Sequence, residues 1–165
     1  RSSAFQPGNV LLSCRNRGAI SLIDSETGSV VWAMQGDWVM QHEPVVLENG
    51  RMLLFDNQGN GGFSRVIELD PVTREIAWAF SGSPPESFYA IGLGTAARLA
   101  NGNTLITEST RGHAFEVTPE KDVVWEFVNP QRVYEGDTEL IAAIFEVLRL
   151  PEDYTASWLQ ATSAH

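Results

Sequence analysis

Apolar and polar residues alternate along most of this chain in short segments that are separated by turn residues. Alternation with a period of two is the pattern of a half-buried β-strand. Tryptophan recurs at a fixed place in the pattern, at Trp32, Trp78 and Trp125, which are 46 and 47 residues apart. Three further segments precede each tryptophan-bearing segment, and one of them opens with Gly-Asn or Asn-Gly. Each repeat therefore predicts four short strands.

A repeat of four strands over about 40–50 residues is typical of a β-propeller. We therefore predict an all-β fold, a β-propeller fragment of about three four-stranded antiparallel blades. The blades are expected over residues 1–36, 37–84 and 85–130. Each tryptophan lies on the outermost strand of its blade and is expected to pack between blades. A β-sandwich with accidental internal similarity is the alternative.

The repeat ends after Pro130, where a polar linker begins. Residues 139–150 fit either a helix, because of the Ala-Ala pair, or a strand, because IFEVLRL alternates. We predict a strand at 144–150 that starts or closes a further blade, which extends the partial propeller over 1–150. Residues 151–165 are expected to form a C-terminal tail. Three blades leave open edges, so we expect more blades from the same or a second chain.

Length and charge narrow the class of protein. The 165 residues suggest one domain, and the net charge of −10 argues against nucleic-acid binding. No apolar run approaches the ~20 residues that a membrane helix needs, so no membrane span is expected. Cys14 is the single cysteine and excludes an intrachain disulfide. Arg1 stands in place of an initiator methionine and no signal-like start follows, which suggests a processed product or a piece of a longer chain.

The candidate chemistry centres on residues 41–65, a predicted hairpin followed by a glycine-rich loop. In antiparallel strands the start of the first strand lies beside the end of the second. His42, Asp56, Asn57 and Arg65 are therefore expected at one rim. A largely neutral imidazole is a competent nucleophile near pH 7. A histidine that simply caps a strand through a hydrogen bond is the alternative.

The loops between the second and third strands of each unit carry many basic residues for an acidic protein. Arg15 and Arg17 lie in the first loop, Arg65 in the second, and Arg111 with His113 in the third. Guanidinium groups at one mouth attract and orient an anion. The alternative is that these arginines pair with neighbouring carboxylates.

The segment FDNQGNGGF resembles a calcium loop only faintly. Asp56, Gln58 and Asn60 alternate before a glycine, but the acidic end ligand is missing. We therefore expect a glycine-rich turn, no metal and no cofactor.

Three stretches resemble the arylsulfotransferase family of β-propellers: SCRNRGAISLIDSETGSVVWAMQG, QHEPVVLENGRMLLFDNQGNGGFSRVIELD and GTAARLANGNTLITESTRGHAFEVTPEKDVVWEF. The Gln-His, LLFDN and Ser-Arg pieces are the most specific. The similarity covers about residues 8–130, and RLPEDY is similar to the C-terminal end of the family, so the chain corresponds to its C-terminal half.

This resemblance implies a six-bladed periplasmic or secreted protein. Such proteins transfer a sulfuryl group from an aryl sulfate to another phenolic compound through a sulfated histidine, without a nucleotide donor. The resemblance implies that His42 carries the sulfuryl group, with Arg65 as the foremost oxygen ligand. Two alternatives are a non-catalytic scaffold for protein partners and a quinoprotein-like cofactor binder. The latter is suggested because IDSETGSVVW is similar to the blade motif of pyrroloquinoline-quinone propellers.

The chain departs from the family pattern in its histidines. The positions that match His42 are Arg1 and Ser2 in the first unit, and Gly94 and Thr95 in the third. Glu43 follows the histidine where the family often has aspartate. Strict alternation along the strand turns Glu43 to the opposite face from His42.

Overall fold

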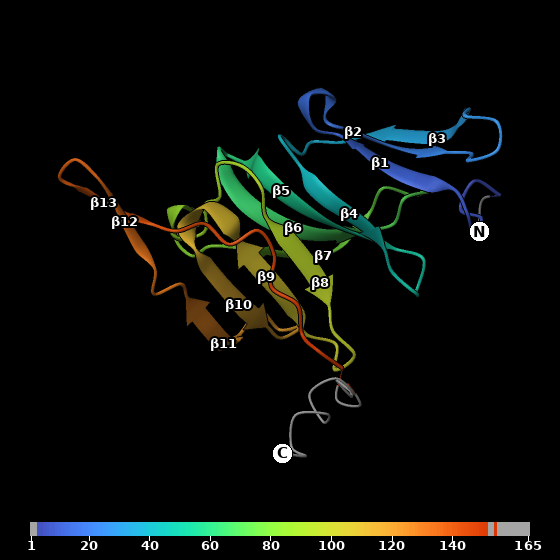
Figure 1. Ribbon diagram of the computed structural model, residues 1–165. Helices are drawn as coiled ribbons and strands as arrows, with labels where there is room; N and C mark the ends of the chain where they lie inside the picture. Colours follow the sequence, from blue (N-terminus) through green and yellow to red (C-terminus); the bar gives the residue numbers. More distant parts are fainter. Residues whose placement is uncertain (1–2, 152–153, 155–165) are drawn as a thin grey trace, which may run out of the picture.

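The structure, a computed structural model, describes residues 3–151 and 154, and is built of antiparallel β-sheets (Figure 1). The first sheet contains β1 (Val10–Cys14), β2 (Ala19–Ile23) and β3 (Val30–Gln35). The second contains β4 (His42–Val46), β5 (Met52–Asn60), β6 (Phe63–Leu69) and β7 (Ile76–Ser81). The third contains β8 (Thr95–Arg98), β9 (Thr104–Glu108), β10 (His113–Val117) and β11 (Val123–Val128), and a hairpin of β12 (Arg132–Glu135) and β13 (Thr138–Ile141) follows. Three 3-10 turns are η1 (Arg15–Arg17), η2 (Pro85–Ser87) and η3 (Ser109–Arg111).

Neighbouring strands in each sheet are consecutive in sequence, and the three sheets follow one another around an arc (Figure 1). This arrangement confirms the predicted all-β propeller fragment. Two apolar clusters hold the arc together. One, around Ile20 and Leu54, joins the first and second sheets, and the other, around Phe55 and Phe115, joins the second and third. Most of the predicted C-terminal tail at 151–165 lies outside the described residues.

The first sheet has three strands in the described part of the chain, where four were predicted. Residues before β1 form a turn instead. Pro7 lacks a backbone N–H, and Gly8 has a φ of 95° that ends an extended segment. Asn9 closes the turn by donating from Nδ2 to the carbonyl oxygen of Ala4 at 2.9 Å. The turn brings Phe5 against Trp32, with their ring centroids 5.2 Å apart.

Trp78 packs between blades, as predicted. It lies against the second of these clusters, and its indole Nε1 donates to the carbonyl oxygen of Pro119 in the β10–β11 turn at 2.8 Å. The guanidinium of Arg98 on β8 lies 5.0 Å from the ring centroid, and its Nη2 is 2.6 Å from a carboxylate oxygen of Glu68. The contacts of Arg98 with Glu68 and Trp78 thus hold the third sheet against the second.

The predicted strand at 144–150 is wrong, because no strand is assigned there, and the helical alternative is wrong as well. The segment runs along the third sheet, where Val147 N donates to Thr107 Oγ1 at 3.1 Å. Arg149 pairs with Glu116, and its guanidinium lies 5.2 Å from the ring centroid of Trp125. A strand requires a ladder partner, and the described residues offer this segment none. It nevertheless occupies the position on the third sheet that β8 occupies on the second.

The face of the third sheet beyond this segment is partly uncovered. Trp125 and Phe127 on β11 are 37% and 41% exposed, and their rings stack with centroids 6.5 Å apart. The corresponding residues of β7, Trp78 and Phe80, are partly buried against the third sheet. The exposed pair therefore lies where a further blade would pack.

Candidate functional site

His42 begins β4, where its Cα is paired with that of Phe55 on β5. Its half-buried ring places Nδ1 2.7 Å from Oδ1 of the fully buried Asn57. Asn57 Nδ2 donates to the carbonyl oxygens of Ala90 and Leu93 at 2.8 and 2.6 Å. Both of these oxygens can only accept, so they fix the amide orientation and turn Oδ1 toward the imidazole. In the neutral ring Nδ1 therefore carries the hydrogen, and Nε2 carries the free lone pair.

Hydrogen bonds of a second polar side chain, Ser64, hold the loop before β8 (residues 88–93) against the second sheet. Ser64, fully buried on β6, donates to the carbonyl oxygen of Asn57 at 2.9 Å. Its Oγ accepts a bond from the backbone N–H of Ala90, also at 2.9 Å. Residues 88–93 are therefore fixed around Asn57, and they support its contact with His42.

The two positions of the third sheet that match His42 in sequence are Gly94 and Thr95, and the strand register selects Thr95, whose Cα pairs with that of Thr107 as the Cα of His42 pairs with that of Phe55. The preceding residue, Gly94, has a φ of 116°, and a Cβ there would lie 2.7 Å from the ring of Phe55. Side chains are strained at such a φ and would also collide with that buried ring. The packing of the second and third sheets therefore requires glycine here.

Asp56 and Arg65 lie together, but on the other side of the second sheet from Asn57. Successive residues of a strand point to opposite faces. The carboxylate of Asp56 is fully buried, and its Oδ2 lies 2.7 Å from Arg65 Nε. Its Oδ1 accepts from the backbone N–H groups of Val39 and Gly59, both at 2.9 Å. Arg65 also lines a cavity of about 220 Å³ with residues of the first sheet.

His113 and Arg111 are likewise engaged by carboxylates in the third sheet. His113 Nδ1 is 3.0 Å from Glu108 Oε2, and its Nε2 is 2.8 Å from Glu126 Oε1. The hydrogen bond to Glu108 is the main reason why the pKa of His113 is raised above its ordinary value. Arg111 Nε lies 3.6 Å from Glu108 Oε1. Neither residue forms a contact with His42 that would place it in the same cluster.

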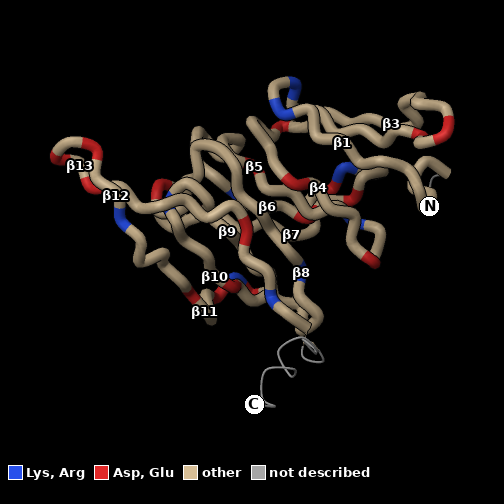
Figure 2. The backbone as a smooth tube through the Cα atoms, in the orientation of Figure 1, with Lys and Arg blue, Asp and Glu red and all other residues tan. Residues whose placement is uncertain are grey.

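Arg15 and Arg17 are the basic residues of η1, at the loop between β1 and β2 (Figure 2). Nη2 of Arg15 lies 3.9 Å from the position that a Cβ atom on Gly92 would occupy. Arg15 therefore reaches from the first sheet to the loop that orients Asn57. In the described part of the chain the guanidinium of Arg17 has no carboxylate partner. Both arginines line a cavity of about 440 Å³ together with Met40.

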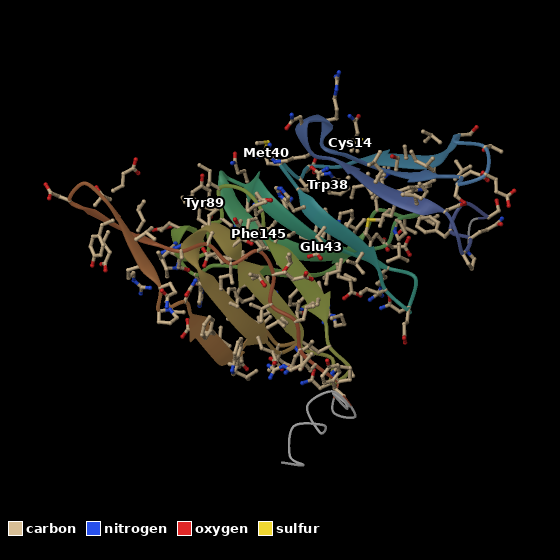
Figure 3. All side chains as sticks on the ribbon, viewed as in Figure 1. Cys14, Trp38, Met40, Glu43, Tyr89 and Phe145 are labelled. Atoms are coloured by element: carbon tan, nitrogen blue, oxygen red, sulfur yellow. The ribbon has the colours of Figure 1, made fainter. Side chains whose placement is uncertain are left out.

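Glu43 departs from the strict alternation that the sequence predicts for this strand. A bulge interrupts the pairing between His42 and Val45, and Glu43 has a φ of 45°. Its Oε2 is buried with no hydrogen-bond partner. Burial, followed by the charge of Glu146, raises the pKa of Glu43. Figure 3 labels Glu43 on β4 and Phe145 on the C-terminal segment, and Glu146 is the residue that follows Phe145 in sequence. Pro44 lies within this bulge and is the local sequence signal that could have indicated it, because proline in a sheet is confined to edge strands, strand starts and bulges.

The described residues contain no helix that could cross a membrane. The same part of the chain holds no group of three or more His, Cys, Asp or Glu side chains arranged to bind a metal.

The fold and this rim define a β-propeller protein with a histidine-centred site. A sequence model of the arylsulfotransferase (ASST) family matches residues 3–130. The chain therefore belongs to the arylsulfotransferase family.

Comparison with solved structures finds similarity to the crystal structure of a protein of unknown function from Bacteroides caccae. The two chains are 16% identical with a TM-score of 0.49, and the alignment covers 73% of this chain and 42% of the other. This chain thus spans less than half the length of that protein. Comparison with curated proteins finds no match.

Proposed function

We propose that this protein transfers a sulfuryl group between phenolic compounds, with Nε2 of His42 as the nucleophile. The observation that carries the proposal is the bond between His42 and Asn57, which leaves Nε2 with the free lone pair. Membership of the arylsulfotransferase family supports the substrate class, an aryl sulfate donor and a phenolic acceptor.

The reaction has two steps. The lone pair of Nε2 attacks the sulfur of the aryl sulfate, the S–O bond to the ring breaks, and the phenolate leaves with the electron pair. A second phenol then attacks the sulfur of the sulfohistidine, its proton passes to solvent, and the N–S electron pair returns to Nε2. Histidine can serve as a covalent nucleophile of this kind.

The sulfuryl oxygens need cationic donors, because sulfuryl transfer resembles phosphoryl transfer in spreading charge over them. We assign this role to Arg15, which reaches the loop around Asn57, with Arg17 beside it. Arg65 is instead assigned to hold Asp56, because its guanidinium is paired with that buried carboxylate. Arg111 is 53% exposed and supplies additional positive charge near η3.

We place the protein in the periplasm or outside the cell, as the family resemblance implies. The active form has further blades, from the same or a second chain. The exposed pair of Trp125 and Phe127 supports this, because the equivalent residues of the second sheet are covered by a blade.

The test is to incubate the protein with nitrophenyl sulfate and measure its intact mass and the release of nitrophenol. We expect a mass increase of one sulfuryl group, absent in His42→Ala. Arg15→Ala should lower the rate by about a hundredfold or more, since it removes a charged donor to the transition state. Arg74→Ala, in the β6–β7 turn, is the matched control and should react normally. Transfer that survives His42→Ala would contradict the proposal.

A non-catalytic scaffold is the second candidate, and the exposed apolar pair on β11 favours it. Trp125 and Phe127 fit a protein partner as well as a further blade. Absence of sulfation in an assembled protein that binds such a partner through β11 would favour this function.

A further inference from the structure

His113 lies between two carboxylates. Its Nδ1 is 3.0 Å from Glu108 Oε2, and its Nε2 is 2.8 Å from Glu126 Oε1. Ionised carboxylates only accept hydrogen bonds, so both ring nitrogens must carry hydrogen for both bonds to form. The geometry therefore fits an imidazolium. The ring also stacks on Phe115 with centroids 4.9 Å apart.

The charged groups around His113 come from several elements. Glu108 on β9 is buried, whereas Glu126 on β11 is 60% exposed. Arg111 on η3 lies beyond Glu108, at 3.6 Å from its second oxygen. Lys121, in the β10–β11 turn, lines the same cavity of about 440 Å³ as His113. The close contacts of the imidazolium are thus with negative charges.

The second sheet has the same arrangement with a permanent cation. Arg65 is directly opposite Asp56 across β6 and β5, and His113 is directly opposite Glu108 across β10 and β9. In both sheets a basic side chain on the third strand pairs with a buried carboxylate on the second. Arginine keeps its charge at all accessible pH values, whereas histidine titrates near neutrality.

The carboxylate that His113 pairs with is bonded to the loop that surrounds the candidate nucleophile. Glu108 Oε1 accepts from the backbone N–H of Tyr89 at 2.8 Å. The next residue, Ala90, receives the bond from Asn57 Nδ2, and Asn57 in turn accepts from His42. A continuous series of bonds therefore connects His113 to His42.

We propose that His113 is a positioning residue for His42. As a cation, His113 holds Glu108 against the 88–93 loop and so keeps Asn57 aimed at the imidazole of His42. This inference rests on the proposed function. When His113 loses its proton, one of the two carboxylates loses its donor, and buried Glu108 keeps only the half-exposed Arg111 as a cationic partner, at 3.6 Å. The loop then loosens, and sulfation of His42 slows at alkaline pH.

The experiment measures single-turnover release of nitrophenol from nitrophenyl sulfate, from below to well above the ordinary histidine pKa of about 6.5. This half-reaction needs no acceptor, so ionisation of an acceptor phenol does not contribute. A misplacement of a catalytic group by ~1 Å can lower a rate about a hundredfold. A loosened loop displaces His42 only part of the time, so we expect the wild-type rate to fall about tenfold on the alkaline side. His113→Arg, which reproduces the permanent cation of Arg65, should abolish most of that fall, and His113→Gln should be slow at every pH.

A second measurement follows the imidazole nitrogens of His42 by NMR. Wild-type protein and His113→Arg should show hydrogen on Nδ1 of His42, and His113→Gln should show a mixture of both tautomers. An alkaline fall in His113→Arg equal to that of the wild type, or an unchanged His42 tautomer in His113→Gln, would overturn the inference. Absence of sulfohistidine in the wild type would overturn the proposed function instead, while the NMR result would still decide the positioning role.

Discussion

Arg149 occupies the same place on the third sheet that Arg98 occupies on the second. Each guanidinium lies over a tryptophan of the outermost strand and pairs with a glutamate of the strand beside it. Arg98 belongs to the first strand of a blade, so residues 144–150 lie on the third sheet in the position that the first strand of a blade takes on the second, although they form no strand. The junction between blades is therefore a repeated contact as well as a repeated sequence.

The two arginines should differ in their contribution to stability. Arg98 is 20% exposed and Arg149 is 47% exposed. Arg98→Ala leaves the buried carboxylate of Glu68 with fewer donors and should cost about 1–3 kcal/mol. Arg149→Ala removes a half-exposed guanidinium from Glu116, which keeps two asparagine side chains as donors, and should cost no more than about 1 kcal/mol. Urea unfolding of both variants measures the difference, and equal losses would contradict this interpretation.

Asn57→Leu should reduce both stability and sulfation. The substitution removes the donors to the carbonyl oxygens of Ala90 and Leu93, and each buried acceptor left unpaired costs about 1–3 kcal/mol. Thermal unfolding and the intact mass after incubation with nitrophenyl sulfate measure the two effects. Asn101→Leu, in the exposed β8–β9 turn, is the control for sulfation. Full sulfation in Asn57→Leu would show that the amide does not orient His42.

Arg65→Met should unfold more easily by about 3–5 kcal/mol, because it leaves the fully buried carboxylate of Asp56 without its cation. Adding Asp56→Asn removes the unpaired charge, and the neutral amide oxygen still accepts from Val39 and Gly59. The double variant should therefore recover part of the loss in urea unfolding. A double variant less stable than Arg65→Met would argue against the buried ion pair as the cause.

Stability should fall as the pH rises through the folded-state pKa of His113. That pKa is raised above the ordinary value of 6.5, mainly by the hydrogen bond to Glu108 and against the effect of burial. A raised pKa means that the folded state holds the proton more tightly, so this stabilisation is fully present below about pH 6.5 and is lost above the folded pKa. Melting temperatures across this range should decline in the wild type and decline less in His113→Arg. Identical profiles would exclude His113 as the group responsible.

The uncovered face of β11 should promote self-association. Trp125 and Phe127 are stacked and partly exposed, so they offer an apolar surface to a second molecule. The open edges of the sheets add unpaired backbone groups that can bond to another chain. Light scattering of the 165-residue chain should therefore reveal oligomers, and Phe127→Ser should shift the distribution toward monomer. A sharply melting monomer of the unsubstituted chain would refute this expectation.

The sequence by itself determined the blades. Alternation sets which face of a strand is apolar, and the spacing of Trp32, Trp78 and Trp125 sets the repeat. Both are local properties, so the all-β propeller class followed from them. The place of His42 at the start of β4 also followed, because the Asn-Gly turn at Asn49 and Gly50 fixes the hairpin.

Only the tertiary structure decided which hydrogen-bond and ion-pair partners the side chains have in other sheets. Asn57 bonds to residues 33 and 36 positions later, and Arg149 contacts a glutamate 33 positions earlier. Such contacts depend on how one sheet packs on the next, which alternation does not encode. The pairing of Arg65 with Asp56 is different, because the two residues lie directly opposite each other on β6 and β5 of one sheet, and only the burial of the carboxylate depends on the packing of neighbouring sheets.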